Sequence, residues 1–161
     1  MKKIKLTQGQ YAIVDESDFN KLSKLKWFAV KKSTGFYAVR NLYLGNGKSR
    51  PYYMHQFLMK PPKGKYVDHK DHNTLNNCRS NLRVCSPLES ARNKSLPKNN
   101  TSGYKGVSWN RTNNSWVANI KVGSKMSYLG MFATKFAAAY AYDKSATKNF
   151  GEFSKLNFPA V

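Results

Sequence analysis

The chain has 161 residues, 40% hydrophobic and 14% aromatic, a composition that argues against a wholly disordered protein and suits one average domain or two small ones. Its 28 Lys and Arg residues against 8 Asp and Glu residues give a net charge of +20, which indicates a polyanionic partner, first of all nucleic acid. An anionic membrane surface is the alternative, but it usually requires a basic amphipathic helix, and we find no such pattern.

The cysteines and the first residues bear on the compartment. Cys78 and Cys85 do not form a Cys-x-x-Cys pair, and no second pair completes a zinc site. We therefore expect buried free thiols and no structural zinc. Residues 1–8 lack the apolar core of a signal peptide, and no apolar run approaches a membrane span. These features predict a soluble intracellular protein.

Residues 1 to about 60 predict a β-rich lead-in. Phe19, Leu22 and Leu25 recur at helical spacing, with Ser17 or Asp18 as the expected cap. His55 lies in a short apolar segment, where a packed core residue is favoured over a ligand. Short apolar runs between turn residues predict strands at Tyr11–Val14, Trp27–Val30, Phe36–Val39 and Pro51–Tyr53.

The next stretch combines a strand end, a polar loop and a capped helix. Tyr66-Val67 predicts a brief strand that ends on Asp68-His69. After the loop, Ser86-Pro87-Leu88-Glu89 combines a serine cap, a proline at the first helical position and a glutamate three residues after the cap. Ser90 and Asn93 lie one turn apart on this helix, so they share a face.

Residues 94–102 have no hydrophobic period and predict a linker, with a domain boundary near residue 99. Three strands are then expected over 104–111, 116–122 and 126–132. On the middle strand one face is expected to be apolar and to carry Trp116, Ala118, Ile120 and Val122. The opposite face would carry Val117, Asn119 and Lys121. Thr134 is the expected cap of a long alanine-rich helix that closes at Gly151 and packs on the apolar face.

An Asp-His pair at a strand end has two interpretations. Phosphodiester cleavage needs an activated water and charge stabilisation at the phosphate. A histidine can act as the general base, and a carboxylate can hold the metal. The other interpretation is solvated polar surface, which a bare dipeptide favours.

The surroundings of Asp68-His69 favour the first interpretation. The stretch from Val67 to Arg83, Val-Asp-His-Lys-Asp-His-Asn-Thr-Leu-Asn-Asn-Cys-Arg-Ser-Asn-Leu-Arg, resembles the homing branch of the HNH endonucleases of the ββα-metal class. Met54-His-Gln is also similar to that family. The resemblance implies that His69 is the general base, that Asp68 binds the metal, and that Asn81 braces the loop and orients the histidine. His72 and Arg83 would support the loop or contact phosphate.

The sequence departs from that family at Ser90, where the helix normally carries Asn or His as the second metal ligand. A serine hydroxyl is a shorter and poorer ligand for a divalent cation. Ser90 could bind the metal through water, Asn93 could replace it, or the site could be weakened or inactive. The resemblance implies Mg²⁺ as the cofactor, with Mn²⁺ as an alternative.

The C-terminal residues are similar to AP2 DNA-binding domains. The resemblance rests on five motifs: Gly103-Tyr-Lys-Gly-Val-Ser-Trp109, Trp116-Val-Ala-Asn-Ile120, Tyr128-Leu-Gly-Met-Phe132, Ala137-Ala-Ala-Tyr-Ala-Tyr-Asp143 and Leu156-Asn-Phe-Pro159. It implies a sheet inserted into the major groove of double-stranded DNA, with contacts from Lys105, Trp109, Arg111, Asn119, Lys121 and Tyr128. Ordinary core packing is an equal alternative for Trp109. Ser108 and Met126 stand where plant members carry arginine, so the target sequence stays open.

These observations predict an α+β protein with two domains. Residues 1–98 would form a ββα-metal HNH nuclease domain with a β-rich lead-in and a core motif at 54–94, and residues 99–161 an AP2-like sheet with one helix. The leading hypothesis is a metal-dependent homing endonuclease from a phage or mobile element, acting in bacterial or phage-infected cytoplasm. The alternative is a sequence-specific DNA-binding protein with an inactive nuclease domain. A monomer and a DNA-dependent dimer both stay open.

Overall fold

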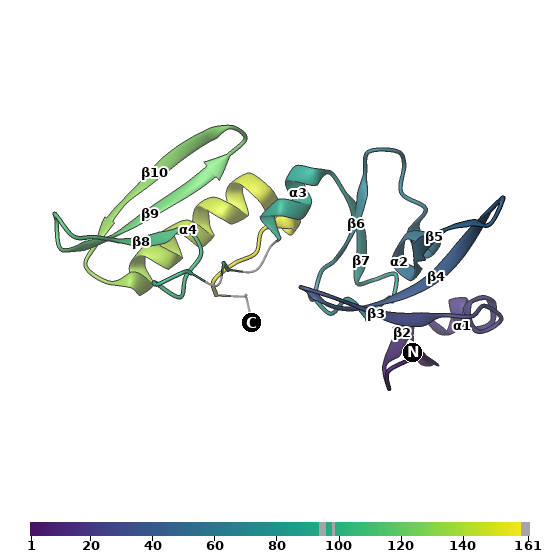
Figure 1. The fold of residues 1–161 in the computed structure, drawn as a ribbon. Helices are drawn as coiled ribbons and strands as arrows, with labels where there is room; N and C mark the ends of the chain where they lie inside the picture. The colour runs from purple at the N-terminus through teal and green to yellow at the C-terminus, as the bar shows by residue number, and fades with distance from the viewer. Residues whose placement is uncertain (94–95, 98, 159–161) are drawn as a thin grey trace. The chain divides into compact units, whose positions relative to one another are not determined.

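The computed structural model describes residues 1–93, 96–97 and 99–158 and divides into two compact units, Met1–Pro87 and Leu88–Val161 (Figure 1). Both units mix small antiparallel sheets with helices, as the α+β expectation states. This division falls at the start of a helix, earlier than the domain boundary expected near residue 99. Among the described residues, no helix is long and apolar enough to cross a membrane.

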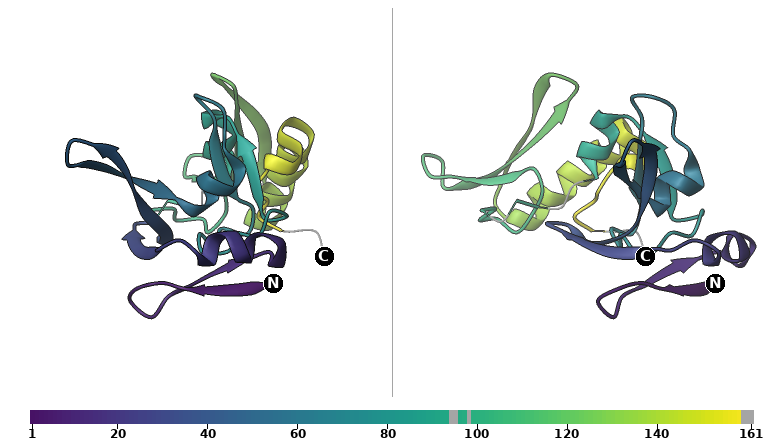
Figure 2. Two further views of the ribbon diagram at one scale, coloured as in Figure 1. Left: turned by 90° about the vertical axis from the view of Figure 1, so that its right-hand side faces the viewer. Right: turned by 45° about the vertical axis from the view of Figure 1, so that its right-hand side comes forward.

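The N-terminal unit is built from three antiparallel sheets. The β1–β2 hairpin packs beside α1 (Figure 2), β3, β4 and β5 form one sheet in sequence order, and β6 pairs with β7. Leu22, Met54 and Val14 are among the largest fully buried side chains of the core. In chain order the elements are β1 (Lys2–Lys5), β2 (Tyr11–Val14), α1 (Glu16–Ser23), β3 (Phe28–Lys32), β4 (Gly35–Gly45), β5 (Lys48–Tyr53), α2 (Met54–Met59), β6 (Tyr66–His69) and β7 (Leu82–Cys85).

Most local predictions for this unit are confirmed, including the four strands and the burial of Cys78 and Cys85. The expected cap of α1 is wrong, because the helix begins at Glu16 and the cap position is Asp15. The Asp15 side chain makes no capping bond, and its Oδ2 instead accepts the Arg79 backbone N–H at 2.7 Å. The Asp15 side chain, which could have capped α1, instead bonds the backbone of Arg79, 64 residues later in the chain.

The C-terminal unit places α4 across one face of a three-stranded sheet, in the order β10-β9-β8 (Figure 1). Val107, Ala118, Ala138 and Ala139 form one of its buried clusters, since the small alanines let the helix approach the sheet closely. Thr134 caps α4 by accepting the Ala137 N–H, as expected. The elements are α3 (Pro87–Arg92), β8 (Val107–Asn110), β9 (Ser115–Val122), β10 (Lys125–Phe132), α4 (Lys135–Phe150) and the short helix η1 (Gly151–Phe153).

The buried carboxylate of Asp143 on α4 fixes the segment that follows the helices. Its two oxygens accept the backbone N–H groups of Asn157 and Phe158, both at 2.8 Å. The Asn157 side chain in turn accepts the backbone N–H of Lys105 at 2.7 Å. Asp143 and Asn157 thus join the C-terminal segment to the entry of the sheet.

Candidate functional site

The β6–β7 hairpin positions the predicted base and metal ligand. Asp68 pairs with Arg83 and His69 with Leu82 in the antiparallel register. Neighbouring residues on a strand point to opposite faces. His69 is therefore buried, with 5% of its surface exposed, while the Asp68 side chain keeps 16% exposure.

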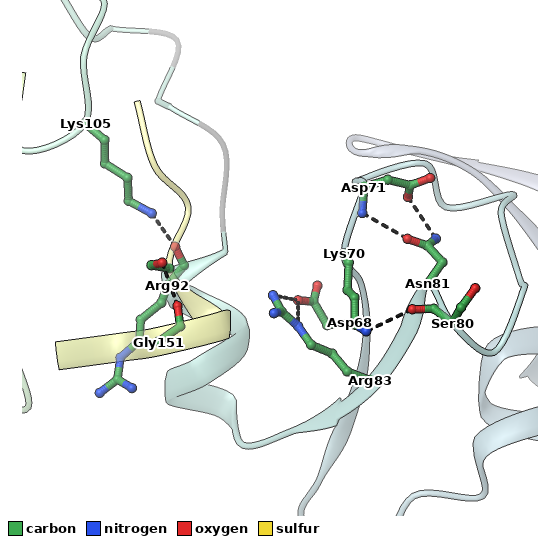
Figure 3. Close-up of polar contacts among 10 residues, drawn as sticks. Asp68, Lys70, Asp71, Ser80, Asn81, Arg83, Arg92, Lys105 and Gly151 are labelled. Atoms are coloured by element: carbon green, nitrogen blue, oxygen red, sulfur yellow. Dashed lines mark hydrogen bonds and ion pairs between the residues drawn. The ribbon is translucent and has the colours of Figure 1, made fainter. Parts of the chain in front are cut away.

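Arg83 holds the Asp68 carboxylate in place (Figure 3). Its Nη2 and Nε donate to the same oxygen, Asp68 Oδ2, at 2.9 and 3.2 Å. The two side chains are directly opposite across the hairpin, where charges of opposite sign stabilise a strand pair. Arg83 thus supports the predicted ligand, and a cation that binds Asp68 would share the carboxylate with this guanidinium.

His69 lies in a cluster of aromatic rings. The His55 ring packs edge-on against it at 5.0 Å between centroids, and the Tyr37 ring lies at 6.3 Å. The Asn77 Oδ1 atom is 3.5 Å from His69 Nε2. Burial lowers the pKa of His69, although Asn77 and nearby carboxylates oppose that shift. The cluster therefore favours the neutral imidazole, which is the form that can accept a proton.

Asn81 braces the polar loop between the two strands. Its Nδ2 donates to Asp71 Oδ1 at 2.9 Å and to the Asn76 carbonyl at 2.8 Å, and its Oδ1 accepts the Asp71 backbone N–H (Figure 3). Burial would raise the pKa of Asp71, but hydrogen bonds from Asn76, Asn73 and Asn81 lower it below its usual value. The Asp71 carboxylate thus stays ionised as the centre of the loop.

The same loop is docked on the N-terminal hairpin and α1. The Ile13 N–H donates to the Leu75 carbonyl at 2.8 Å, and the Ile13 carbonyl accepts the Asn77 N–H at 2.7 Å. The Arg79 guanidinium forms a bidentate ion pair with the buried Asp18 carboxylate at 2.7 and 2.8 Å. Asn77, which faces His69, is therefore held by a strand about 60 residues earlier in the chain.

The helix α3 carries Ser90, one of the two candidates for the second metal ligand, and Leu88 to Arg92 of this helix group with the C-terminal unit. Ser90 is half-buried within the helix, and Asn93 is buried just beyond its end. The Arg92 carbonyl accepts a hydrogen bond from Lys105 Nζ (Figure 3), and the Arg92 guanidinium lies 4.2 Å from the centre of the Phe150 ring. These contacts attach the end of α3 to the segment just before β8 and to α4.

Side chains of the C-terminal sheet that point away from α4 form what we call the outer face. Asn119 is opposite Tyr128, and Lys121 is opposite Met126, while Ala118 and Ile120 point into the core between them. The outer face consists of Ser108, Asn110, Ser115, Val117, Asn119, Lys121, Met126, Tyr128 and Met131.

The structure thus brings together three of the six predicted DNA contacts, Asn119, Lys121 and Tyr128. Arg111 lies in the exposed turn between β8 and β9. The Trp109 ring packs against Trp116 at 5.0 Å between centroids, and its register with Trp116 places it on the α4 side of the sheet. Burial lowers the pKa of Lys105, whose ammonium group bonds to α3. Contacts of Trp109 and Lys105 with DNA stay a prediction.

His55, Asn77, Asp71 and Arg79 are the site residues that the sequence did not assign to it. Burial of His55 as a core residue is confirmed, but its contact with His69 was not predicted. The only local signal for Asn77 and Asp71 was the concentration of amide and acidic residues after His69. Arg79 had no local signal, since its partner Asp18 lies 61 residues away.

The burial of His55 makes the stability of the N-terminal unit depend on pH. Burial, assisted by the proximity of His69, lowers the His55 pKa from 6.5 to about 3. Between these values the unfolded chain binds a proton that the folded chain does not, so stability falls as pH falls. We expect protonation of His55 in the unfolded chain to lower the free energy of unfolding by about 2 kcal/mol at pH 5, relative to neutral pH. The lowered pKa of His69 adds a further loss of stability.

Urea unfolding at pH 7 and at pH 5, followed by hydrogen exchange at β6 and β7 amides, measures this loss. A His55→Gln variant should lose a smaller part of its stability over the same pH range, because glutamine does not titrate. An equal loss in both proteins would contradict the assignment to His55.

Comparisons with known proteins find similarity to HNH endonucleases and to APETALA2-like proteins of plants. A family model described as HNH endonuclease matches residues 60–92. The uncharacterized HNH endonuclease L560 of Acanthamoeba polyphaga mimivirus is 33% identical over 156 residues, which cover 93% of this chain and 76% of that protein. Protein 3.8 of Escherichia phage T7 is 44% identical over 64 residues, 40% of this chain and 53% of its own length.

The APETALA2-like protein 2 of Oryza sativa subsp. indica is 36% identical over 72 residues, 45% of this chain and 17% of the plant protein. The chain thus spans about half of the T7 protein (53%) and a small part of the plant protein. The class that the hairpin site and the sheet define is therefore a nuclease fold joined to an AP2-like domain. The chain belongs to the HNH endonuclease family.

Proposed function

We propose that the protein is a metal-dependent DNA endonuclease of the homing type, whose AP2-like domain selects the site of cleavage. The observation that carries this proposal is the buried, neutral His69 beside the Asp68 carboxylate at the end of β6. The net charge of +20 supports DNA as the substrate. The viral and phage relatives support an origin in a phage or mobile element, with action in the cytoplasm of the infected cell.

In this proposal His69 accepts a proton from the attacking water. A neutral imidazole carries one N–H, so a proton on Nε2 that donates to Asn77 Oδ1 leaves the lone pair on Nδ1. Nδ1 is then the atom that takes the proton. Asn81 and Asp71 hold the loop that carries Asn77, which makes them positioning residues.

The metal site would use oxygen ligands. Among the described residues, no three histidine, cysteine, aspartate or glutamate side chains form a metal-binding group. A site with one carboxylate, Asp68, and neutral oxygens from Ser90 or Asn93 still fits the preference of Mg²⁺ or Mn²⁺ for hard ligands. When bound, such a cation supplies charge stabilisation at the scissile phosphate and its leaving oxygen.

The ββα-metal arrangement is part of the same proposal. The strands β6 and β7 and the helix α3 follow one another along the chain in the order that this arrangement requires. We propose that residues 1–98 act as the nuclease domain and that 99–161 act as the DNA-reading domain. A monomer would nick one strand, and a DNA-dependent dimer would cut both.

A second candidate is a DNA-binding protein whose nuclease domain is inactive. The observation that favours it is Ser90, because its hydroxyl is a weak ligand at the position where the helix should hold the metal. In that case occupancy of the DNA by the AP2-like domain would be the whole function.

Cleavage assays with Mg²⁺ or Mn²⁺ separate the two candidates. The variants are Ser90→Asn, which supplies an amide ligand, Ser90→Ala, which removes the hydroxyl, and His69→Ala. We expect Ser90→Asn to lower the metal concentration needed for half-maximal cleavage by about 10-fold, since changes around a metal shift affinity by about 10–100-fold.

Metal-dependent nicks that His69→Ala does not produce would support the enzyme. Cleavage by Ser90→Asn alone would show that the natural metal site is weakened at Ser90. If neither the natural protein nor Ser90→Asn cuts any DNA substrate, the nuclease proposal is overturned.

A further inference from the structure

The outer face of the C-terminal sheet exposes large apolar side chains. Met126, Tyr128 and Met131 are 66%, 60% and 50% exposed, and all three come from β10. A surface that gathers exposed apolar side chains and is rimmed by charged residues marks an interaction site. Exposed Arg111 and Lys125 lie at the ends of the strands that form this face. A partner must therefore combine an apolar surface with negative charge.

The duplex DNA of the proposed function has both properties in its major groove. Phosphates line the groove edges, and the methyl groups of thymine project into it. The major groove is about 12 Å wide and admits β-strands, whereas the minor groove is about 6 Å wide. Arg111 and Lys125 are thus suited to the phosphates, and the outer face to the base edges.

Guanine is read most often by the guanidinium of arginine, which bonds its O6 and N7 together. The nine residues of the outer face include no arginine, and Lys121 is the one cation among them. Lysine acts as a point charge rather than a two-pronged donor. The outer face therefore lacks the usual reader of G·C pairs.

The amide side chain on the central strand of this face is suited to adenine. Asn119 carries an amide, which can donate to N7 and accept from N6 of adenine in a bidentate pair. Asn119 lies on the central strand β9, opposite Tyr128 and two residues from Lys121. Its side chain therefore projects from the middle of the outer face, which is the part of the sheet that would lie over the floor of the major groove.

The methionines complete the pattern for A·T pairs. Apolar side chains contact the thymine methyl group, and the flexible, polarisable thioether adapts to such a contact. Met131 is oriented by a hydrogen bond from Asn113 Nδ2 to its sulfur at 3.2 Å. Met126 lies opposite Lys121, so that Tyr128 lies between the two methionines along β10.

We propose that the outer face selects A·T-rich DNA, with Asn119 pairing with adenine and with Met126 and Met131 contacting thymine methyl groups. This inference rests on the proposed function, because it takes DNA as the partner of the AP2-like domain. Lys121 allows at most one position of guanine preference beside the A·T pairs.

Selection of bound duplexes from a random DNA pool tests the inference. The full chain is incubated with the pool in EDTA, which prevents metal-dependent cleavage, and the bound sequences are determined. We expect an A·T-rich motif. Asn119→Ala should relax one adenine position by about 5–150-fold, the range expected for one bidentate base contact. Met126→Arg should introduce a guanine preference at a neighbouring position.

Tyr140→Ala is the matched control, because Tyr140 is an aromatic residue 69% exposed on α4, on the other side of the sheet. It should leave the selected motif unchanged. A G·C-rich motif that depends on Asn119, or binding without sequence preference, would overturn the inference and leave nuclease function standing. A folded protein that fails to bind any duplex at low salt would overturn the proposed function itself.

Discussion

Replacing His69 with alanine is expected to lower the rate of DNA cleavage by about 10²–10⁴-fold, the usual contribution of a positioned general base. The imidazole is neutral because it is buried, so its loss removes a proton acceptor and no charge. The affinity of the protein for DNA should therefore change little. The rate is measured as nicking of supercoiled plasmid DNA at saturating Mn²⁺. If the natural protein is inactive, the comparison is made in the Ser90→Asn background.

Two measurements distinguish loss of the base from loss of structure. The thermal unfolding of His69→Ala reports whether the aromatic cluster with His55 and Tyr37 survives. Added imidazole should restore part of the rate, because the space left by the side chain can admit a free base. A variant that is folded and cleaves at the natural rate would remove His69 from the mechanism.

Replacing Gly106 with alanine is expected to destabilise the C-terminal unit by about 2–5 kcal/mol. Gly106 has a φ of +74°, and an added Cβ would lie 2.0 Å from the Tyr142 ring and 2.6 Å from the Asn119 carbonyl oxygen. The left-handed backbone costs an alanine about 1–2 kcal/mol, and overpacking adds about 1–3 kcal/mol. The Asn119 backbone cannot move away, because its N–H donates to the Gly106 carbonyl at 2.8 Å.

Gly103→Ala is a matched control for this variant. Gly103 has a similar φ of +78°, but a Cβ there meets no atom within 4 Å. It should therefore lose only the backbone part, about 1–2 kcal/mol. The free energy of unfolding of both variants is measured by urea unfolding, monitored by the fluorescence of Trp109 and Trp116. The DNA affinity is measured as well, and in Gly106→Ala it should fall in proportion to the unfolded fraction. Equal losses in the two variants would contradict a steric role for Tyr142 and Asn119.

Much of the fold could be predicted from the sequence because its signals are local. The short apolar runs at Tyr11–Val14 and Phe36–Val39 lie in strands, Pro87 begins α3, and the alternation from Trp116 to Val122 separates the two faces of β9. Each signal acts within a few residues, through backbone conformation or side-chain period. β7 was implied by the HNH resemblance, but the pattern of its four residues, Leu82–Cys85, did not locate it.

The surroundings of the candidate site could not be predicted in the same way. Asp68 and His69 stand out by adjacency and by the motif around them. What keeps His69 neutral, however, is its burial in a ring cluster to which α2 contributes His55. The partner of Arg79 is Asp18, and the strand that holds Asn77 is β2. Such contacts depend on the tertiary fold and leave no periodic trace in the sequence.

The attachment of the β6–β7 loop to Ile13, Asp15 and Asp18 has a consequence for protein engineering. The segment that matches the family model, residues 60–92, is therefore not expected to fold when it is transferred alone into another protein. A chimera that transplants it alone would leave behind the acidic side chains that neutralise Arg79 and the strand edge on which Asn77 lies. Any transfer of this HNH segment to another protein is therefore expected to require the first hairpin and α1 as well.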